Sequence, residues 1–382
     1  MKILSLTYEY LPIGGGGSRV AAAINEEMVR LGDQVAVLTS AMKGLPAEET
    51  VNGVVIHRTA CVRRHSHYTT AAELVTTLLP AYRRGAELIR ADRPDVIYTH
   101  FILPSGLLAW ALSRRFRIPY VLTAHGSDVP GYNPDRFGLL HWLLRPVWRR
   151  ILQGAAAVTS PSRFLARLMH VQGCPVPVQV LPNGHRPMQP FGEQRRNRIL
   201  VVARMFPRKG IQHFIDAVSG MDNDWEMIIA GDGPYRGELE ARARRVAPKV
   251  RFVGFVSPET LRILYESSRI LVFPSIQENF PMVLLEAMDA GCAIVTTNAE
   301  GCAEVVGHAG IVVPKGNPKG IRDALERLVG DPDLVGKLSA RGQARAATLT
   351  WPRIVPQYRE VLSSAISTSP ILDRRAASRT PS

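Results

Sequence analysis

The stretch NGHRPMQPFGEQRRNRILVVAR, residues 183–204, decides the fold. It begins with a segment rich in Pro, Gly and charge, which is typical of a connection between domains. It then enters the apolar run RILVVAR, which has the composition of a buried β-strand. On each side of this boundary, short aliphatic runs alternate with longer amphipathic segments. This alternation predicts two α/β domains in succession, each built on a doubly wound parallel sheet.

The strand candidates of the first series are KILSLTY, QVAVLT, VVIHRT, DVIYTH, YVLTAHG and AAVTSPS, with amphipathic segments at 18–31 and 72–91. Those of the second series are RILVVAR, WEMIIAGDG, VRFVGFV, ILVFPS and CAIVTTN, with helices expected at 210–219, 234–246, 258–267 and 281–291. We therefore expect a first domain over 1–186 and a second over 187–350. A late helix over 351–366 is expected to pack back on the first domain, and the polar tail over 367–382 is expected to be disordered.

Composition points to a globular protein, with 46% hydrophobic and 21% charged residues in a chain of 382. No apolar run reaches the roughly 18–20 residues that a bilayer span needs. The opening MKILSLTYEY predicts a first strand rather than a signal peptide, because Glu9 interrupts it and no cleavage site follows. The four scattered cysteines form no CxxC pair, so neither a disulfide framework nor a zinc site is expected. These features favour the cytoplasm.

The net charge is +14, and residues 1–186 carry 21 Lys/Arg against 12 Asp/Glu. Much of this excess stands beside apolar and aromatic residues in YRRGAELIR (82–90), WALSRRFR (110–117) and HWLLRPVWRRIL (141–152). Such mixtures suit an anionic membrane surface, here the inner face of the plasma membrane, or a polyanionic ligand; a solvated helix face has the same composition. No recognition motif accompanies the charge, so nucleic-acid binding is not expected.

A glycine run follows the first strand in YEYLPIGGGGSRV, residues 8–20. A dinucleotide fingerprint requires GxGxxG or GxGxxA, but Arg19 or Val20 stands at the third position, and no acid ends the second strand. A P-loop requires a Lys after the glycines, and none is present. Two interpretations remain. The loop presents backbone N–H groups to an anion at a helix N-terminus, or it is a mobile turn.

Two cations stand at the first strand end of the second series, in VARMFPRKG (202–210). Arg204 offers a bidentate fork and Lys209 a compact charge, and together they suit a diphosphate. Each taken singly is more often a surface charge. The following strand ends in AGDGP, where Gly231 stands in a tight turn of low specificity.

The segment PSIQENFPMVLLEAMDAG, residues 274–291, carries the most information. Pro281 is expected to open a helix that contains Glu286, and Glu278 stands just before it. A carboxylate beside a buried apolar run needs a partner, and a ribose diol would serve Glu286. Glu278 and the N–H groups of 279–282, apart from Pro281, which has none, would face sugar hydroxyls and phosphate. An internal salt bridge for Glu286 and an exposed loop acid for Glu278 are the alternatives.

In the first series, TAHGSDV (123–129) places His125 just past a strand, and IYTHF places His100 similarly. A histidine at a strand end is often a structural residue with satisfied hydrogen bonds. Neutral imidazole, or the backbone carbonyl of His125, can also contact a hydroxyl or a developing positive charge. Of the two histidines, His125 is the favoured candidate.

Taken together, these residues resemble glycosyltransferase family 4, the glycogen-synthase-like group of retaining enzymes with the GT-B fold. The matching pieces occur in order over residues 1–365. They are the glycine loop (14–17), HGSD (125–128), PNG (182–184), Arg204 with KG (209–210), GDGP (231–234), FVGFV (252–256), Glu278 and Glu286 before AMDAG, and GCAEVV (301–306). The resemblance implies two Rossmann-like domains that face a central cleft, the first for the acceptor and the second for a nucleotide-sugar.

The resemblance also implies roles for individual residues. Catalytic roles are implied for His125, Arg204, Lys209 and Glu278. Donor-binding roles are implied for Gly16, Gly17, Gly231, Val256, Asn279, Phe280, Pro281, Met282 and Glu286. Arg204 and Lys209 would neutralise the diphosphate, and His125 would touch the sugar near its anomeric carbon. The chain departs from the family pattern at His185, Arg186, Ala293 and Cys302, which leaves donor preference and acceptor open.

The implied reaction moves a sugar from a UDP- or GDP-linked donor to an acceptor hydroxyl, with retention at the anomeric carbon. No metal is expected, because cations and helix N-termini can stabilise the leaving diphosphate, and DND (222–224) and DPD (331–333) lie in predicted turns. The basic, Trp-rich first domain favours a saccharide or lipid-linked acceptor in envelope polysaccharide, lipid-linked saccharide or glycolipid biosynthesis. A GT-B sugar-nucleotide epimerase and a non-catalytic sugar-nucleotide-binding homologue remain as alternatives, whereas the failed fingerprint disfavours hydride transfer.

Overall fold

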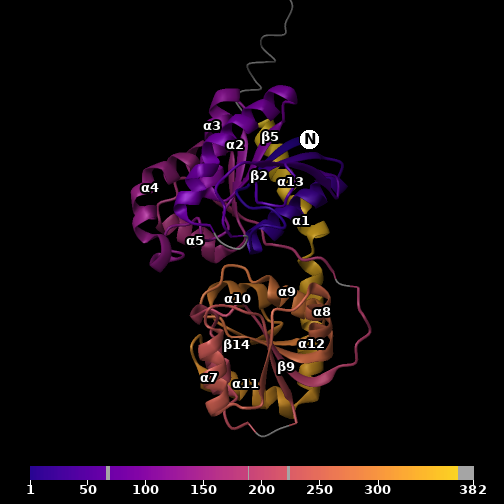
Figure 1. The fold of residues 1–382 in the computed structure, drawn as a ribbon. Coiled ribbons are helices and arrows are strands. Elements are labelled where there is room, and N and C mark those ends of the chain that lie inside the picture. Colours follow the sequence, from indigo (N-terminus) through magenta and orange to yellow (C-terminus); the bar gives the residue numbers. More distant parts are fainter. Residues whose placement is uncertain (66–68, 188, 222–223, 369–382) are drawn as a thin grey trace, which may run out of the picture. The chain divides into compact units, whose positions relative to one another are not determined.

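The computed structural model describes residues 1–65, 69–187, 189–221 and 224–368. The chain forms two compact units, one of Met1–Asn183 together with the segment from Trp351 onward, and one of Gly184–Thr350 (Figure 1). The boundary falls after Asn183 rather than after residue 186. The reason is that the His185 N–H donates to the Leu349 carbonyl oxygen at 2.9 Å, which ties this segment to the second unit.

The first unit is built on an eight-stranded sheet with the order β3-β4-β2-β1-β5-β6-β7-β8. Its strands are β1 (Lys2–Leu6), β2 (Gln34–Ser40), β3 (Glu48–Val51), β4 (Val54–Thr59), β5 (Val96–His100), β6 (Tyr120–Thr123), β7 (Ala157–Ser160) and β8 (Val178–Val180). Its helices are α1 (Gly16–Arg30), α2 (Ala71–Ala91), η1 (Ile102–Gly106), α3 (Leu107–Phe116), α4 (Pro134–Gly154), α5 (Arg163–Val171) and α13 (Trp351–Ser367). All strand pairs are parallel except β3 with β4.

The second unit is built on a six-stranded parallel sheet with the order β11-β10-β9-β12-β13-β14. Its strands are β9 (Arg196–Val202), β10 (Glu226–Ala230), β11 (Val250–Gly254), β12 (Ser268–Phe273), β13 (Ala293–Thr297) and β14 (Gly310–Val313). Its helices are η2 (Pro207–Lys209), α6 (Ile211–Ala217), α7 (Arg236–Val246), α8 (Pro258–Ser267), α9 (Met282–Asp289), α10 (Glu300–Val306), α11 (Pro318–Gly330) and α12 (Pro332–Thr348).

Both sheets reverse their direction of winding at one place, and this switch point positions the candidate sites. In the second unit the chain starts at β9, runs outward to β11, and returns to β12 on the other side of β9. In the first unit the same reversal lies between β1 and β5. Ligands of doubly wound sheets bind beyond the carboxyl ends of the strands at such a switch point. A ligand is therefore expected at the loops that follow β1, β5, β9 and β12.

Every predicted strand and helix named above is confirmed, but three edge strands, β3, β8 and β14, were not predicted. The strand β3 differs from the others in its direction. It pairs antiparallel with β4 through a turn at Asn52 and Gly53, which have φ values of +50° and +81°. The expected helix over 351–366 is present as α13. The disordered tail was predicted to begin at residue 367, but this residue is the last one of α13. Residues 369–382 of the predicted tail lie outside the described residues.

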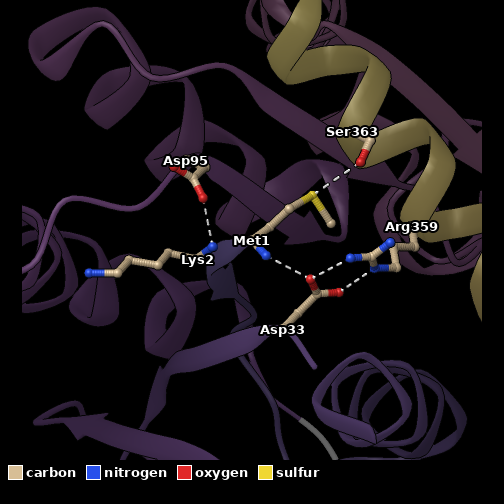
Figure 2. Close-up of polar contacts among 6 residues, drawn as sticks. All are labelled: Met1, Lys2, Asp33, Asp95, Arg359 and Ser363. Carbon is tan, nitrogen blue, oxygen red and sulfur yellow. Dashed lines mark hydrogen bonds and ion pairs between the residues drawn. The ribbon is translucent and has the colours of Figure 1, made fainter. Parts of the chain in front are cut away.

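Helix α13 contacts α1, β5 and β6 of the first unit, and Figure 2 shows the polar contacts that hold it there. Asp33 lies between α1 and β2, and its side chain has no solvent exposure. The carboxylate accepts hydrogen bonds from Arg359 Nε at 2.8 Å, from Arg359 Nη2 at 3.1 Å and from the Met1 ammonium at 2.7 Å. The Ser363 hydroxyl donates to the Met1 sulfur at 3.4 Å. Asp33 therefore joins the last helix to the beginning of the first sheet.

Replacing Asp33 with Asn should lower the free energy of unfolding by about 1–3 kcal/mol at pH 7, because the buried acceptor of two cations loses its charge. Burial alone would raise the pKa of Asp33, but the Arg359 guanidinium and the Met1 ammonium outweigh it and hold that pKa below its ordinary value. The stabilisation is complete above the unfolded pKa of about 3.9 and is lost as the pH falls through the lowered folded pKa. Urea denaturation should show the two proteins converging below about pH 4.

The matched control is Asp323→Asn, which removes a carboxylate from the exposed Lys319–Asp323 pair. This change should alter the free energy of unfolding by less than about 1 kcal/mol. Equal stability of Asp33→Asn and the unaltered protein at pH 7 would contradict the anchoring role.

Candidate active site

An ion pair stands at the switch point of the second unit. Lys209 ends η2 on the segment that follows β9, and Glu278 lies on the loop between β12 and α9. The Lys209 ammonium contacts Glu278 Oε1, and the Ser275 hydroxyl donates to the same oxygen at 3.2 Å. The two charged side chains are 14% and 12% exposed. A nearly buried cation and anion thus meet where the topology favours a ligand.

Backbone contacts hold the two loops in place. The Ile276 N–H donates to the Arg208 carbonyl oxygen at 2.9 Å, and the Ser275 Oγ lies 3.1 Å from that oxygen. A Cβ added to Gly210 would stand 1.9 Å from the Pro274 carbonyl oxygen, and one added to Gly301 would stand 2.0 Å from the Asn279 carbonyl oxygen. Glycine at both positions is therefore required by close backbone approach.

The segment from Asn279 to Met282 leads into α9. Asn279, Phe280 and Pro281 are buried, and Pro281 is the N-cap residue, so that the helix begins at Met282, one residue later than predicted. The N-terminus of α9 adds partial positive charge beside Glu278. Glu286 lies on the second turn, where its Oε2 accepts a hydrogen bond from the Tyr265 hydroxyl of α8 at 3.1 Å. This contact is a hydrogen bond from a phenol, whereas the alternative stated for Glu286 was an internal salt bridge.

Three other predicted donor residues lie along the carboxyl edge of this sheet. Arg204 is exposed, and its guanidinium lies 5.7 Å from the centre of the Phe206 ring. Gly231, with a φ of +129°, would place a Cβ 2.0 Å from the Ala203 carbonyl oxygen, so packing alone requires glycine there. Val256 follows β11, two strands and therefore about 10 Å from β9.

In the first unit, the glycine loop leads into α1 beside Phe101. A Cβ on Gly17 would stand 2.4 Å from Phe101 Cζ, whereas one on Gly16 would meet nothing within 4 Å. Phe101 follows β5 with a φ of +72°, which is rare for a bulky residue and costs about 1–3 kcal/mol. Its ring lies 4.7 Å from that of Tyr8 and 4.5 Å from that of His125, measured between centroids. Backbone strain is thus stored at the predicted site.

His125 is one of a pair of histidines. His100 Nδ1 and His125 Nε2 lie 3.1 Å apart, and His100 has no solvent exposure. Burial lowers the pKa of His125 to about 3 and, together with the charge of His125, lowers the pKa of His100 well below its ordinary value. Both rings are therefore neutral at pH 7, and one donates to the other.

Asp128 fixes the loop that carries His125. One carboxylate oxygen accepts from the N–H groups of His125 at 3.0 Å and Gly126 at 2.8 Å, and the other accepts from the Ile102 N–H at 2.8 Å. Burial outweighs these bonds and raises the pKa of Asp128 above its ordinary value. The carboxyl group joins the loop after β6 to the segment after β5, so His100 and His125 are held on one framework.

Two protein-family models match the chain. Residues 15–184 match the model described as "Glycosyl transferase 4-like domain", and residues 196–331 match the one described as "Glycosyl transferases group 1". The chain is a glycosyltransferase of family 4. It is therefore a transferase of glycosyl groups, as predicted.

Relatives extend over most of the glycosyltransferase. An uncharacterized glycosyltransferase of Methanocaldococcus jannaschii is 29% identical, covering 87% of this chain and 90% of its own. The sucrose-phosphate synthase of Thermosynechococcus elongatus superposes with a TM-score of 0.80 at 21% identity, covering 97% and 100%. The Anabaena protein HepE, solved with UDP-glucose, gives 0.75 at 20% identity, covering 95% and 100%. The predicted GT-B fold class, with two doubly wound α/β domains, is confirmed.

The departures at His185 and Cys302 have structural explanations in the glycosyltransferase. His185 Nδ1 lies 3.0 Å from the Leu349 carbonyl oxygen, and Nε2 lies 3.3 Å from Asp289 Oδ1. Cys302 is fully buried on α10; burial raises the pKa of its thiol to about 12, and the Glu278 charge adds to this effect. Both residues therefore pack inside the second unit and have structural roles there.

His185 predicts a pH-dependent stability. Burial would lower its pKa, but the Asp289 carboxylate, the Leu349 carbonyl and the Glu286 charge outweigh burial and raise it. Its stabilisation is therefore complete below the unfolded pKa of about 6.5 and is lost as the pH rises through the folded value. We expect His185→Gln to be less stable than the unaltered protein by about 1–2 kcal/mol at pH 6 and by less at pH 9, measured by urea denaturation.

The exposed His308 provides the control, because His308→Gln should leave stability unchanged at both pH values. A His185→Gln deficit that grows with pH would show that His185 is not stabilised in its protonated form.

Sequence reasoning did not single out Ser275 or Phe101. Nothing in the sequence marks Ser275 as a site residue, since a lone serine after a strand is common. Phe101 is likewise unmarked, because its positive φ cannot be read from the residue type. Of the two DxD strings, 222–223 lie outside the described residues, and Asp331 is the N-cap of α12, where it accepts from the Leu334 N–H at 2.8 Å.

Proposed function

We propose that this glycosyltransferase moves a sugar, with retention at the anomeric carbon, from a UDP- or GDP-linked donor to a hydroxyl of a saccharide or lipid-linked acceptor. The pathway we propose is envelope polysaccharide, lipid-linked saccharide or glycolipid biosynthesis. The observation that carries the donor assignment is the Lys209–Glu278 pair at the switch point between β9 and β12. The complex of the structural neighbour HepE with UDP-glucose supports a nucleotide-sugar donor.

The pair supplies the two functions that a donor needs. When the donor binds, Lys209 would leave Glu278 and pair with the diphosphate. Glu278 would then accept hydrogen bonds from sugar hydroxyls. Arg204 follows the same strand as Lys209 and would add a second cation. The N-terminus of α9, with the backbone of Asn279 and Phe280, would contact the phosphate and the sugar. Gly231 would contribute by allowing a close turn, Glu286 would hold the ribose, and the loop at Val256 would line the base.

The proposed reaction breaks the bond between the anomeric carbon and the phosphate oxygen and forms a bond from that carbon to the acceptor oxygen. The acceptor proton passes to the leaving phosphate. Cations and helix N-termini stabilise the negative charge that develops on the diphosphate, so we propose that transfer needs no metal. His125, neutral at pH 7, would contact the sugar through its ring or its backbone carbonyl rather than act as a general acid.

The acceptor proposal rests on the exposed face of α4. Trp142 is 68% exposed and Leu143 is 58% exposed. Arg145 and Arg149, three and seven residues after Trp142, are also exposed and lie on the same helical face. An apolar and basic face of this kind suits the boundary of an anionic bilayer. Among the helices described, none is both long and apolar enough to cross a membrane.

The protein is expected to sediment with vesicles that contain phosphatidylglycerol. The double variant Trp142→Ala/Arg149→Glu should bind these vesicles at least about tenfold more weakly, because it loses an interfacial ring and reverses one charge. Arg244→Glu, at an exposed position of α7, is the matched control and should bind much as the unaltered protein does. Equal sedimentation of the double variant would remove the membrane part of the proposal.

The experiment that tests the proposed function is a donor screen. Nucleotide release is measured from UDP-, GDP- and ADP-sugars, with and without lipid extract, in the presence of EDTA. We expect release from a UDP- or GDP-sugar that increases when acceptor is supplied. Isomerised donor without transfer would indicate an epimerase, and binding without release would indicate a non-catalytic homologue.

A further inference from the structure

The two histidines of the first unit meet edge to edge. His100 Nδ1 and His125 Nε2 lie 3.1 Å apart, the ring centres lie 5.3 Å apart, and the ring planes are inclined by 29°. The distance between the centres is close to the N···N distance plus the radii of the two rings. Both nitrogens therefore lie near the line that joins the centres, and the N–H of one ring points at the lone pair of the other.

This hydrogen bond uses Nε2 of His125 and leaves Nδ1 as the second polar atom of its ring. In a neutral imidazole one nitrogen carries the proton and the other accepts, and the hydrogen bonds decide which. If His100 donates from Nδ1, the proton of His125 lies on Nδ1. If His125 donates from Nε2, its Nδ1 carries no proton. The tautomer of His100 therefore decides the tautomer of His125.

The second nitrogen of His100 distinguishes the two arrangements. His100 has no solvent exposure, and its Nε2 has no hydrogen-bond partner among the residues that the structure describes. If His100 accepted at Nδ1, its proton would lie on Nε2 as a buried N–H without an acceptor. In native proteins an orphaned buried N–H is rarer than an acceptor with an unused lone pair. The proton of His100 therefore belongs on Nδ1, where it bonds to His125.

The neighbouring side chains hold the two rings in this arrangement. The ring of Tyr98 lies 4.5 Å from that of His100, and the ring of Phe101 lies 4.5 Å from that of His125, measured between centroids. The Asp128 carboxylate accepts a hydrogen bond from the His125 backbone N–H at 3.0 Å, which fixes the loop. Rotation of either ring would therefore require its neighbours to move, and the hydrogen bond between the histidines is expected to persist.

We propose that His100 is a positioning residue for sugar transfer: it donates to His125 and so fixes the tautomer in which His125 Nδ1 carries the proton. The inference rests on the proposed function, in which His125 contacts the sugar, and it adds the direction of that contact. A ring held in this way donates from Nδ1 to a sugar oxygen. It takes up no proton, because Nε2 already accepts from His100, so His125 does not serve as a general base.

The first test is ¹⁵N NMR of the full chain labelled in histidine, because ring nitrogens with and without a proton differ in chemical shift. The signals of the pair are assigned by their loss in His100→Asn and His125→Asn. At pH 7 we expect a protonated Nδ1 and an unprotonated Nε2 in both residues. A protonated Nε2 on His125 of the unaltered protein would overturn the proposal.

Kinetics provide the second readout, with the donor found by the screen. His100→Asn and His100→Leu have nearly the same shape and leave the same space, but only Asn keeps a hydrogen-bonding group near the place of Nδ1. We expect His100→Leu to have a kcat at least about tenfold below that of His100→Asn, with the donor KM of the two within about twofold. His125 should show both tautomers in His100→Leu. His170→Leu, at an exposed position of α5, is the control and should transfer normally.

Equal kcat values for His100→Leu and His100→Asn would show that the ring of His100 only fills space, and would overturn the positioning role. If both variants failed to fold, the tautomer of His125 in the unaltered protein would still decide the proposal. Failure of the unaltered protein to transfer sugar would instead contradict the proposed function, and the NMR measurement would separate that result from an error in the assigned tautomer.

Discussion

Lys209→Met should lower the rate of sugar transfer by about 10²–10³-fold, because the diphosphate that leaves the sugar would lose its nearest buried cation. The side chain is 14% exposed and contacts Glu278 Oε1, so little water is available to replace its charge. Glu278→Gln should have an effect of similar size, since a neutral amide is a weaker acceptor for sugar hydroxyls than a carboxylate. Nucleotide release and product formation are measured for each variant.

Stability must be measured in parallel, because removal of one partner leaves the other as an uncompensated buried charge. The double variant Lys209→Met/Glu278→Gln removes both charges; it should regain stability and remain inactive. Lys319→Met removes a lysine that is 80% exposed and should leave transfer unchanged. If Lys209→Met were folded and transferred sugar at the normal rate, the site assignment would be wrong.

Gly16→Val should lower transfer by about 100-fold while the free energy of unfolding changes by no more than about 1 kcal/mol. Outside its chain neighbours and the backbone of its own helix, a Cβ at Gly16 meets nothing within 4 Å, so we expect the fold to accommodate it. Displacement of a reacting group by about 1 Å is enough for a loss of this size. Gly17→Val should behave differently, because its Cβ would stand 2.4 Å from Phe101 Cζ and would disturb the fold as well.

The matched control is Gly237→Val, since Gly237 is the second residue of α7 and also has open space around its position for a Cβ. Full transfer by Gly16→Val would restore the interpretation of the glycine run as a structural turn. Unfolding of Gly16→Val would show that the space around Gly16 is needed by the protein itself.

The fold could be predicted from the sequence because buried parallel strands are continuous apolar runs, and eleven such runs stand out from amphipathic segments. Three short edge strands were missed: β8 and β14 have only three and four residues, and β3, EETV, is polar as well. The Asn52–Gly53 pair, followed by VVIHRT, was the available signal, because Asn-Gly favours the turns that join antiparallel strands.

The candidate site could be predicted only in part. Lys209 and Glu278 were each found by their place after a strand, but their ion pair joins residues 69 positions apart. It depends on β9 and β12 being neighbours, which no local pattern specifies. The contact of His100 with His125 likewise depends on the pairing of β5 with β6.

Gly231 shows a limit of reasoning from motifs. It was singled out as a donor-binding residue in GDGP, yet its Cβ would collide with the Ala203 carbonyl oxygen in the absence of any ligand. A glycine can thus be required by packing, by a ligand or by both, and residue type alone does not separate these causes. Because a Cβ at Gly16 has open space around it, a substitution there tests a contact with the ligand more specifically than a substitution at Gly231 does.

Sugar transfer with retention is tested most directly by the anomeric ¹H NMR signal of the product. The protein is incubated with the donor identified by the screen, with acceptor and with EDTA, and the coupling constant of each new anomeric proton is measured. We expect a new glycoside with the anomeric configuration of the donor sugar, and we expect Lys209→Met to form none. A glycoside of inverted configuration, or consumption of the donor to free or isomerised sugar alone, would contradict it.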